Sequence, residues 1–587
     1  MNILGISAYY HESACCLLQD GRLVAAAEEE RFSRIKHDPR LPVSAFGFCL
    51  EAGRLSVADV DCIAYYESPV KKLSRQLWAG EPVGAPPGQP WLDAGRPERE
   101  IREVLGFEGK ILRFDHHQSH AASAFYFSGF QEAAVLTVDG VGEWATTSYG
   151  RGSGSELALF EEVEFPHSLG LLYSTLTAYL GFRVNDGEYK VMGLAPYGTA
   201  RYADRLRQVL LSQPGGQYRL DLSYFDFLRG RRMFSDKLAD LLEGPPRAPE
   251  APLEPRHQDV ARSLQLVLEE MLLEKVGFLR TRVDTPNLCM AGGVALNCVA
   301  NGRILREGPF DRLFVQPAAG DAGGCLGAAA LAHVELCGER PGHGRLGHAY
   351  LGPRYPVEEV AEQIRSLGIS ALDFRGREAN LLEATVDRLL AGRVVGWFHG
   401  AMEFGPRALG ARSLLADPRD PDMRERLNRL VKKREAFRPF APSVLASEAS
   451  GHFDLDHASE FMLETCAVRS PLSLPAITHV DGSARPQTVD PEQAPRYAAL
   501  LAAFHRRTGC PLLVNTSFNV QGEPIVCTPL DALTSLSESE IDCLVLEDFL
   551  IDRPLLGDTL LGLLRYRNAA LYGRGESGVS STLYTFI

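Results

Sequence analysis

This sequence has no C-x-x-C pair and no long apolar run, and its first residues do not have the pattern of an export signal. The 12 cysteines of the 587-residue chain are scattered without a C-x-x-C pair. Cys15 and Cys16 stand inside an apolar run, which favours buried thiols over a disulfide. The start, MNILGISAYYHESACCLL, has no basic segment and no A-x-A site, and no apolar run is long enough to cross a membrane. We therefore expect a reduced, cytoplasmic protein without a membrane partner.

Positive charge is also in short supply. The formal net charge is −14, which argues against a general nucleic-acid or anionic-membrane binder but leaves room for a local basic pocket that holds a small anion. The hydrophobic content of 45% is ordinary for a soluble globular protein. A chain of this length is too long for one core, so we expect two or more domains.

The glycine-rich stretches fit neither standard phosphate-binding fingerprint. CMAGGVALNCVANGR (289–303) follows an apolar strand but contains neither G-x-G-x-x-G nor G-x-x-x-x-G-K-[ST]. Gly292 and Gly293 would let the backbone approach a nucleotide, and Asn297 could hydrogen-bond its ribose or base. EYKVMGLAPYG (188–198), with Lys190, is a second compact loop. Either stretch alone is more often a tight turn than a site.

A three-stranded pattern occurs twice in the first 165 residues. NILGIS, SACCLLQ and RLVAAAEE form one set, and AAVLTVDG, ATTSYG and LALFEEV form the other, with tight turns between the strands. This repetition predicts a duplicated α/β fold with a ligand cleft between the halves. The Pro/Gly-rich stretch 337–356 is typical of an interdomain linker, so we expect domains at 1–350 and 357–587, the latter with a carboxy-terminal tail from 556.

Three of the 15 histidines lie within the five residues HHQSH. His116 and His120 are four residues apart and would share one face of a helix, where an ion could bind both. A structural role is the more common one for such a pair, so further ligands are needed. Asp139 and Asp321 each lie at a strand end beside glycine, although a turn or a helix cap would explain them equally. Two His and two Asp would suit Fe(II), Zn or Mn.

A separate basic set occupies the second half. GPRALGARS, RLVKKREAFRPFAPSV and SARPQTV alternate arginine with glycine, proline and phenylalanine, and NTSFN ends an apolar strand. This alternation favours a walled pocket for phosphate or carboxylate over a solvated charged face. The candidate ligand groups are Arg407, Arg412, Lys432, Lys433, Arg434, Arg438, Arg485, Asn515, Thr516 and Ser517.

These motifs, taken in order, resemble the bacterial O-carbamoyltransferases of nodulation-factor and antibiotic biosynthesis, that is, of secondary metabolism. The resemblance runs from residue 5 to about 525 and covers most of the chain. It rests on HESA, EEERFSRIKH, HHQSHAASAFYFSG, VDGVGE, EYKVMGLAPYG, AGGVALN, PAAGDAGGCLGAA, GPRALGARSLL, FRPFAPSV, RPQTV and NTSFN. The residues 68–100 and the tail match no motif of that family.

The resemblance implies an α/β protein with two domains. The first is similar to the duplicated actin-like ATPase fold of tRNA threonylcarbamoyladenosine proteins. The second is similar to the carbamoyladenylate-forming α/β partner of that pathway. It implies a carbamoyltransferase that makes carbamoyladenylate from carbamoyl phosphate and ATP, and then carbamoylates a hydroxyl of a small-molecule natural product. Nucleic acid is not an expected partner, and a homodimer is one expected assembly.

The same resemblance implies roles for individual residues. His11 matches the catalytic histidine, and Lys36 matches a lysine that could polarise the carbamoyl carbonyl. Iron is the implied metal, held by His116, His120, Asp139 and Asp321. The implied co-substrate-binding residues are Gly140, Lys190, Gly292, Gly293, Asn297, Arg407, Lys432, Arg438, Arg485, Asn515 and Ser517.

Two alternatives stay open at this point. An actin-like ATPase or sugar kinase would explain the first domain but leave the arginine set of the second without a use. A tRNA-modifying protein of the threonylcarbamoyladenosine type would have to bind nucleic acid despite the net charge of −14. The acceptor alcohol cannot be identified from the residues.

Overall fold

The computed structural model describes residues 1–587 except 81–92, 229–231, 343, 433 and 556–587, and the side chains of 430–432. The described residues divide into two compact units. Unit 1 contains Met1–Glu29 and His37–Leu346. Unit 2 contains the short segment Glu30–Lys36 and the residues from Gly347 onward. The predicted tail at 556–587 lies outside the described residues, as does most of the Pro/Gly-rich part of 68–100.

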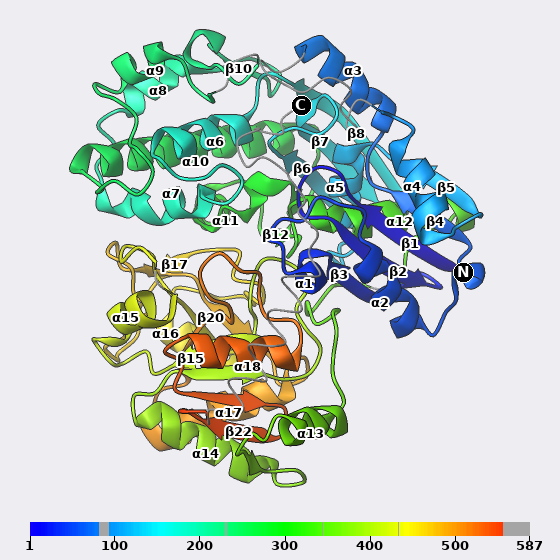
Figure 1. Ribbon diagram of the computed structural model, residues 1–587. Coiled ribbons are helices and arrows are strands. Elements are labelled where there is room, and N and C mark those ends of the chain that lie inside the picture. Colours follow the sequence, from blue (N-terminus) through cyan, green and yellow to red (C-terminus); the bar gives the residue numbers. More distant parts are fainter. Residues whose placement is uncertain (81–92, 229–231, 343, 433, 556–587) are drawn as a thin grey trace. The chain divides into compact units, whose positions relative to one another are not determined.

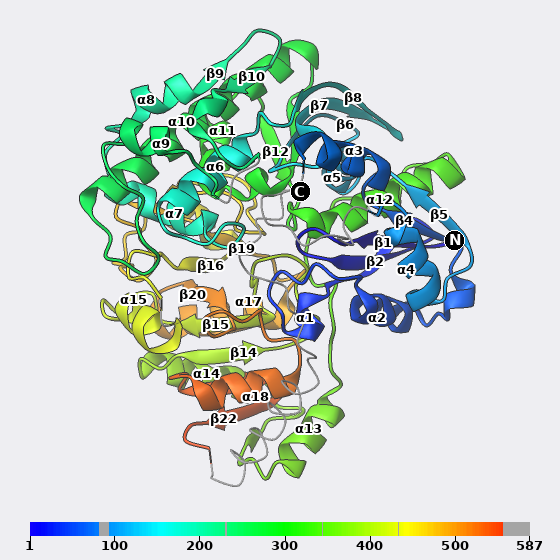
Figure 2. The same ribbon diagram turned by 45° about the horizontal axis from the view of Figure 1, so that its top comes forward.

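Unit 1 is built on two five-stranded sheets of identical topology (Figures 1 and 2). The orders are β3-β2-β1-β4-β5 and β8-β7-β6-β11-β12. In each sheet the three strands that come first along the chain are antiparallel to their neighbours. The other two strands are parallel to the central strand, which is β1 in one sheet and β6 in the other. The strands are β1 (Asn2–Ser7), β2 (Ala14–Gln19), β3 (Arg22–Glu28), β4 (Cys62–Tyr65), β5 (Lys110–Arg113), β6 (Glu132–Val138), β7 (Ala145–Ser153), β8 (Glu156–Glu164), β11 (Asn287–Ala291) and β12 (Arg312–Val315). The predicted duplication is confirmed.

Helices of unit 1 cover these sheets and form a separate layer around α10, which lies beside α6, α7 and α11 (Figure 1). A two-stranded ribbon of β9 (Leu210–Ser212) and β10 (Tyr218–Leu220) adjoins that layer. The helices are α2 (Val43–Gly53), α3 (Pro69–Ala79), α4 (Arg96–Leu105), α5 (His116–Phe125), α6 (Leu169–Tyr179), α7 (Glu188–Leu194), α8 (Ala203–Val209), α9 (Asp236–Leu241), α10 (Pro255–Arg282), α11 (Cys298–Glu307) and α12 (Asp321–Cys337).

Two buried helices fill the space between the sheets of unit 1. Helix α5 packs on β6, β7 and β11, whereas α12 packs on β1, β2 and β4, and the two helices pack against each other. Their approach is close because α12 is rich in glycine: a Cβ at Gly327 would lie 1.7 Å from the Ser119 carbonyl oxygen of α5. A Cβ at Gly5 of β1 would likewise lie 1.9 Å from the Cys325 carbonyl oxygen. Only side chains as small as hydrogen permit this layering.

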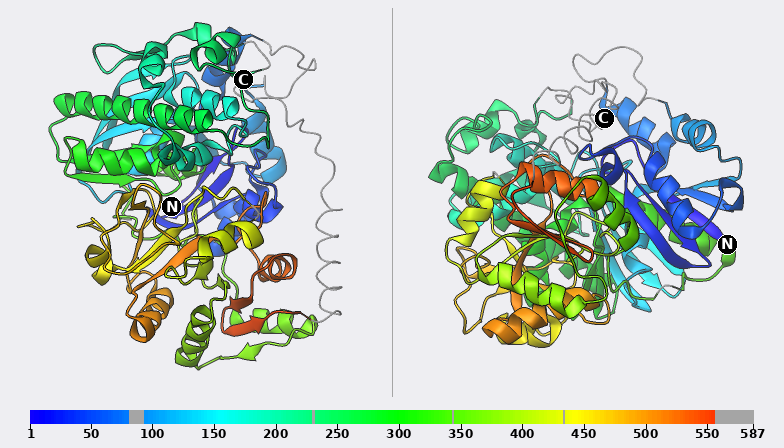
Figure 3. Two further views of the ribbon diagram at one scale, coloured as in Figure 1. Left: turned by 90° about the vertical axis from the view of Figure 1, so that its left-hand side faces the viewer. Right: turned by 60° about the horizontal axis from the view of Figure 1, so that its bottom comes forward.

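Unit 2 contains an eight-stranded mixed sheet in the order β13-β22-β21-β14-β15-β20-β16-β19. Figure 3 shows two further views of the ribbon. Trp397 and Phe504 lie in the fully buried core of unit 2. The strands are β13 (Leu372–Asp373), β14 (Val395–Phe398), β15 (Arg412–Ala416), β16 (Ala441–Leu445), β19 (Gln487–Val489), β20 (Leu512–Ser517), β21 (Cys543–Leu546) and β22 (Phe549–Asp552). The helices are α1 (Glu30–Ser33), α13 (Val357–Ser366), α14 (Glu378–Leu390), α15 (Met423–Arg426), α16 (Ala449–His452), α17 (Pro495–Thr508) and α18 (Pro529–Glu538), with a π-helix at Leu427–Lys432 and a small ribbon of β17 (Cys466–Ala467) and β18 (Ser483–Ala484).

Cys15 and Cys16 are free, buried thiols, as predicted. Among the described residues, no helix is both long enough and apolar enough to cross a bilayer.

Candidate functional site

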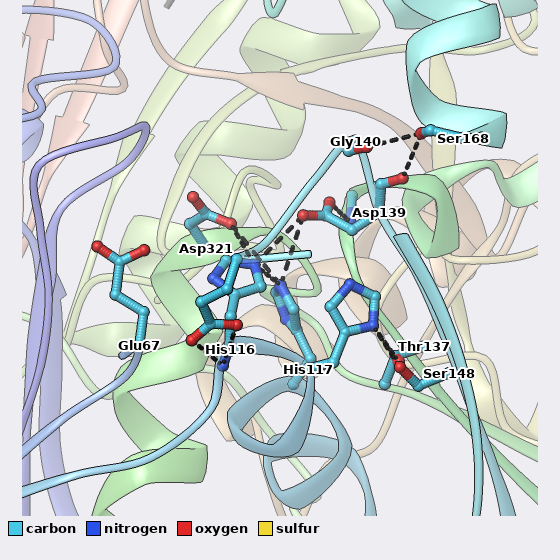
Figure 4. A network of polar contacts seen from close by, with 12 residues as sticks. Glu67, His116, His117, Thr137, Asp139, Gly140, Ser148, Ser168 and Asp321 are labelled. Carbon is cyan, nitrogen blue, oxygen red and sulfur yellow. Dashed lines mark hydrogen bonds and ion pairs between the residues drawn. The ribbon is translucent and has the colours of Figure 1, made fainter. Parts of the chain in front are cut away.

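The candidate metal centre lies where α5 and α12 begin. His116 is the first residue of α5 and His120 is one turn further on, while Asp321 is the first residue of α12. Asp139 directly follows β6. All four side chains are buried, and their donor atoms lie within 4.8 Å of one another. Figure 4 shows the His116, Asp139 and Asp321 side chains turned toward a common point.

The donor spacing matches a single metal ion. The Nε2 atoms of His116 and His120 are 3.0 Å apart, and the Oδ2 atom of Asp139 lies 3.3 and 3.9 Å from them. The Oδ1 atom of Asp321 lies 3.6 and 3.7 Å from the same nitrogens. Metal–ligand bonds of about 2.1 Å place two donors about 3.0 Å apart at a right angle and about 3.4 Å apart at the tetrahedral angle. The four residues therefore fit an ion without rearranging.

The second carboxylate oxygens of Asp139 and Asp321 differ in their hydrogen bonding. Asp139 Oδ1 accepts a hydrogen bond from the Gly293 N–H at 2.8 Å, which aims Oδ2 at the histidines. Asp321 Oδ2 is buried without a hydrogen-bond partner in the described structure. Since an unsatisfied buried carboxylate oxygen is costly, this atom is a further donor for an ion or for a ligand of that ion.

Charge pairing shapes the titration of this cluster. Burial would lower the pKa of His116, but the hydrogen bond with Asp139 and the charge of Asp321 outweigh it and raise the pKa to about 9. Burial would raise the pKa of Asp139, yet the hydrogen bond with His116 and the nearby histidines hold that pKa far below its usual range. The opposite directions of these two shifts show that His116 and Asp139 form an ion pair.

His117 belongs to a different network. Its Nδ1 atom lies 2.7 Å from Thr137 Oγ1 and 3.0 Å from Ser148 Oγ, and the ring is turned away from the cluster (Figure 4). Burial, together with the neighbouring histidines, lowers the pKa of His117 well below its ordinary value. A neutral, fixed ring of this kind supports the packing of α5 on β6 and β7.

Glu143 supports the centre and is missed by the sequence analysis. Its carboxylate accepts hydrogen bonds from the His116 N–H at 2.9 and 3.0 Å and from the Ser68 N–H at 2.6 Å. It therefore caps the amino terminus of α5 from the loop that follows Asp139, and burial raises its pKa. Its place in VDGVGE, four residues after Asp139, was the available signal.

The glycine-rich positions lie beside the centre. Gly292 has φ +91°, and a Cβ there would lie 2.3 Å from the Val138 carbonyl oxygen. The Gly140 carbonyl accepts a hydrogen bond from Ser168 Oγ at 2.6 Å (Figure 4). The Asn297 side chain caps α11 by accepting from the Ala300 N–H at 3.0 Å, and it also pairs with the Gln265 amide. Lys190 lies in α7.

The hairpin turn between β1 and β2 carries His11 to the edge of this centre. His11 Nε2 lies 3.2 Å from the Asn185 carbonyl oxygen, and its ring stacks on that of His37 with the centroids 4.4 Å apart. Glu12 lies beside both rings and next to Gly320, where a Cβ would be 2.8 Å from Glu12 Oε2. The two rings are inclined by 23°, and one donor atom each of His11, Glu12 and His37 lies within 4.8 Å of the others, so this group could also hold an ion. His11 is half-buried.

In unit 2 the candidate anion-binding residues lie where neighbouring strands start or end, along one side of the sheet, which we call the strand-end edge. Strand β20 is antiparallel to β15 and β16, so its end is level with their starts. Strand β19 is parallel to β16 and starts at the same edge. Ser517 ends β20, and the strands that follow Arg407, Arg438 and Arg485 all start at this edge. Lys432 ends the π-helix that precedes this edge, and Lys433 lies outside the described residues.

The loop that carries Arg407 is shaped by Glu403. The Glu403 Oε1 atom accepts hydrogen bonds from the N–H groups of Leu409 and Ala411, both at 2.7 Å. The Asn515 amide nitrogen reaches the Ala408 carbonyl at 3.2 Å and also contacts Ser443 and Gln487. Asn515 is therefore buried beneath the Arg407 loop and supports it.

Arg412 was predicted as part of the pocket, but its guanidinium is fully enclosed. It donates to the carbonyl oxygens of His399, Gly400, Ala411 and Pro353, and it stacks 3.6 Å from the centroid of the Phe398 ring. Burial lowers its pKa. These contacts account for Arg412 as a structural cation. Charge and spacing alone could not separate it from Arg407.

Similarity to known proteins identifies the family. The "Carbamoyltransferase N-terminus" profile matches residues 2–82 and 102–330, and "Carbamoyltransferase C-terminus" matches residues 386–553. The chain belongs to the carbamoyltransferase family and is a transferase.

Relatives cover nearly the whole chain. An uncharacterized protein of Synechocystis sp. is 46% identical over 94% of this chain and 96% of its own length. Nodulation protein NolNO of Sinorhizobium fredii is 39% identical over 93% and 80%. The 3'-hydroxymethylcephem-O-carbamoyltransferase of Amycolatopsis lactamdurans is 28% identical over 92% and 97%. Among solved structures, the ROK hexokinase of Thermus thermophilus matches 57% of this chain and 100% of its own at 14% identity with a TM-score of 0.28.

Proposed function

We propose that this protein forms carbamoyladenylate from carbamoyl phosphate and ATP and transfers the carbamoyl group to a hydroxyl of a small molecule. The observation that carries the proposal is the convergence of His116, His120, Asp139 and Asp321 at the starts of α5 and α12. A carbamoyltransferase that is built around an ion site of this kind has a place for an anionic, phosphate-bearing intermediate. The relatives support the acceptor class, because one of them is named for a hydroxymethylcephem.

The proposed reaction has three steps. Water cleaves the P–O bond of carbamoyl phosphate and gives carbamate and inorganic phosphate. A carbamate oxygen then attacks the α-phosphorus of ATP and displaces pyrophosphate. The acceptor oxygen finally attacks the carbamoyl carbon, AMP leaves, and the hydroxyl proton passes to a base. ATP is thus converted to AMP and pyrophosphate, which distinguishes this reaction from kinase chemistry.

The first two steps are assigned to unit 2. Carbamoyl phosphate is a dianion, and guanidinium forks match its oxygens in charge and geometry. We assign the anion to Arg407, Arg438, Arg485 and Ser517, which precede or end strands at the strand-end edge, and to Lys432, which precedes that edge in the chain. Asn515 acts through its contact with the Ala408 carbonyl.

The transfer step is assigned to unit 1. His11 takes the acceptor proton, since its half-buried ring is fixed at Nε2 by the Asn185 carbonyl. Gly140, Gly292, Gly293, Asn297 and Lys190 lie around the centre or on the helices beside it, and they are assigned to the nucleotide portion. The ion, which we propose to be Fe(II) with Zn or Mn as substitutes, supplies positive charge beside the nucleotide phosphate when bound. Lys36, to which the polarisation of the carbamoyl carbonyl is assigned, groups with unit 2.

The test is release of pyrophosphate and AMP from ATP with purified protein. Pyrophosphate release should require carbamoyl phosphate, and AMP release should increase with added acceptor alcohols. ADP release without carbamoyl phosphate would refute the proposal in favour of an ATPase or sugar kinase. Turnover that requires tRNA would refute it in favour of a nucleic-acid-modifying protein.

A further inference from the structure

Seven residues from the amino-terminal region are built into unit 2. Glu30–Lys36, which includes α1, groups with unit 2, although Met1–Glu29 and His37 onward group with unit 1. We call Glu30–Lys36 the insert segment. It lies more than 300 positions before the rest of unit 2, so a carboxy-terminal unit that began at Gly347 would lack it. Its contacts show what unit 2 would lose.

Arg31 holds the turn that leads to Arg407. The Arg31 side chain is buried, with 4% of its surface exposed. Its Nη1 atom donates to Glu30 Oε1 at 2.7 Å, and its Nη2 atom donates to the Gly405 carbonyl oxygen at 2.8 Å. Gly405 has φ +113°, a conformation that L side chains rarely adopt. A charge-assisted bond therefore fixes the main chain two residues before Arg407.

Arg34 holds a second loop, which follows β20 and Ser517. Its Nη1 atom donates to the Ile525 carbonyl at 2.6 Å, and its Nη2 atom donates to the Pro524 carbonyl at 2.9 Å. Its Nε atom lies 3.7 Å from Asp531 Oδ1 at the start of α18. The guanidinium thus fixes the return of the chain from the Ser517 end of β20.

Phe32 joins the two loops. It packs against a separate apolar cluster of Met402, Ala408, Ile525 and Cys527. Met402 and Ala408 lie on either side of Arg407 in the chain, and Ile525 and Cys527 belong to the segment that follows Ser517. The insert segment therefore contacts both loops with apolar and charged groups together.

We propose that the insert segment is a positioning element of the carbamoyl-phosphate site, in which Arg31 sets the place of Arg407 and Arg34 sets the place of the Ser517 loop. This inference rests on the proposed adenylation in unit 2. Arg31 and Arg34 act through main-chain carbonyls and do not contact the substrate themselves. Neither role follows from the family match, because the insert segment belongs by sequence to the amino-terminal profile.

The kinetic test uses full-length Arg31→Ala, Arg31→Lys and Arg34→Ala. Pyrophosphate release is measured at varied carbamoyl phosphate and at varied ATP. We expect the KM for carbamoyl phosphate to rise on the order of tenfold in Arg31→Ala, as the loss of one charge-assisted hydrogen bond predicts, with the KM for ATP little changed. Arg31→Lys should recover part of the effect. Transfer from supplied carbamoyladenylate should remain.

A second readout does not depend on the reaction. Hydrogen exchange of the amides in 402–411 should accelerate in Arg31→Ala, and exchange in 520–527 should accelerate in Arg34→Ala. Arg340→Ala is the matched control, because that guanidinium also donates to main-chain carbonyls, of Phe130, Phe125 and Tyr126, but in unit 1. It should change neither segment.

The outcomes separate the two proposals. Unchanged exchange in both segments would overturn the positioning role, whatever the enzyme catalyses. Altered exchange with an unchanged KM for carbamoyl phosphate would overturn it as well. If the wild-type protein releases no pyrophosphate with carbamoyl phosphate, the proposed function fails, and with it the catalytic meaning of the insert segment, even where the exchange effects are observed.

Discussion

Gly327→Ala tests whether close packing of α5 on α12 creates the metal centre. The added Cβ would lie 1.7 Å from the Ser119 carbonyl oxygen, whereas an ordinary contact begins at 3.4 Å. The contacted atom is main chain within a buried helix, so it cannot move alone. One helix must therefore retreat by about 1.7 Å at this point. Such overpacking is expected to destabilise unit 1 by about 1–3 kcal/mol.

The retreat also acts on the ligand set, because His120 belongs to α5 and Asp321 to α12. Their donor atoms are 3.7 Å apart. A shift of the full size along this direction would stretch the pair to about 5.4 Å, and two donors on one ion with bonds of about 2.1 Å are separated by at most about 4.2 Å. We therefore expect the variant to lose metal as well as stability.

The assay combines thermal unfolding with metal content per chain from elemental analysis. Gly327→Ala should lower the unfolding midpoint on the order of 5 °C and reduce bound metal severalfold. Gly277→Ala, in the interior of α10, is the control, since nothing lies within 4 Å of the added Cβ and alanine favours helix. It should be neutral or slightly stabilising. A Gly327→Ala protein with wild-type midpoint and metal content would refute this account of the packing.

Three further predictions concern histidines. His120→Ala should remove most bound metal, because it deletes one of four donors, whereas His117→Asn on the same helix should retain it; equal loss in elemental analysis would contradict the ligand assignment. His11→Asn should still release pyrophosphate from ATP and carbamoyl phosphate but should transfer the carbamoyl group on the order of 100-fold more slowly, and unimpaired transfer would exclude His11 as the base. His457→Gln should flatten the pH dependence of stability. The hydrogen bond with Glu464 raises the folded-state pKa of His457 to about 9, so the contribution of His457 to stability is complete below its unfolded pKa of about 6.5 and is lost as the pH rises through about 9. Because the side chain is partly exposed, this contribution should stay below about 1 kcal/mol. Urea unfolding at several pH values measures it, and equal wild-type and variant curves would exclude it.

The repeated sheets of unit 1 could be predicted because strand patterns are local. Apolar runs between tight turns mark β1 to β3 and β6 to β8, and parallel strands then follow their crossover helices. The metal set is distributed over more than 200 residues, yet each member has a local signal: an i, i+4 pair on a helix, or an aspartate between a strand and glycine. Those signals can be combined without knowing the three-dimensional structure.

Other features depend on contacts that have no local signature. Arg407 and Arg412 occupy similar sequence surroundings, but only the carbonyls around Arg412 show that it is a structural cation. The assignment of Glu30–Lys36 to unit 2 is a further case. The sequence around Arg31 and Arg34 has no feature that points to unit 2, and their partners Gly405 and Ile525 lie hundreds of residues away in the chain.

The insert segment also changes what a two-domain description means for this chain. The chain enters unit 2 at Glu30, returns to unit 1 at His37 and enters unit 2 again at Gly347. The first visit is short and is fixed at Arg31 and Arg34, and one peptide bond at each end joins it to Glu29 and His37 of unit 1. His37, which stacks on His11, is the first residue after the segment. One peptide bond therefore joins the insert segment to the His37 ring that stacks on His11.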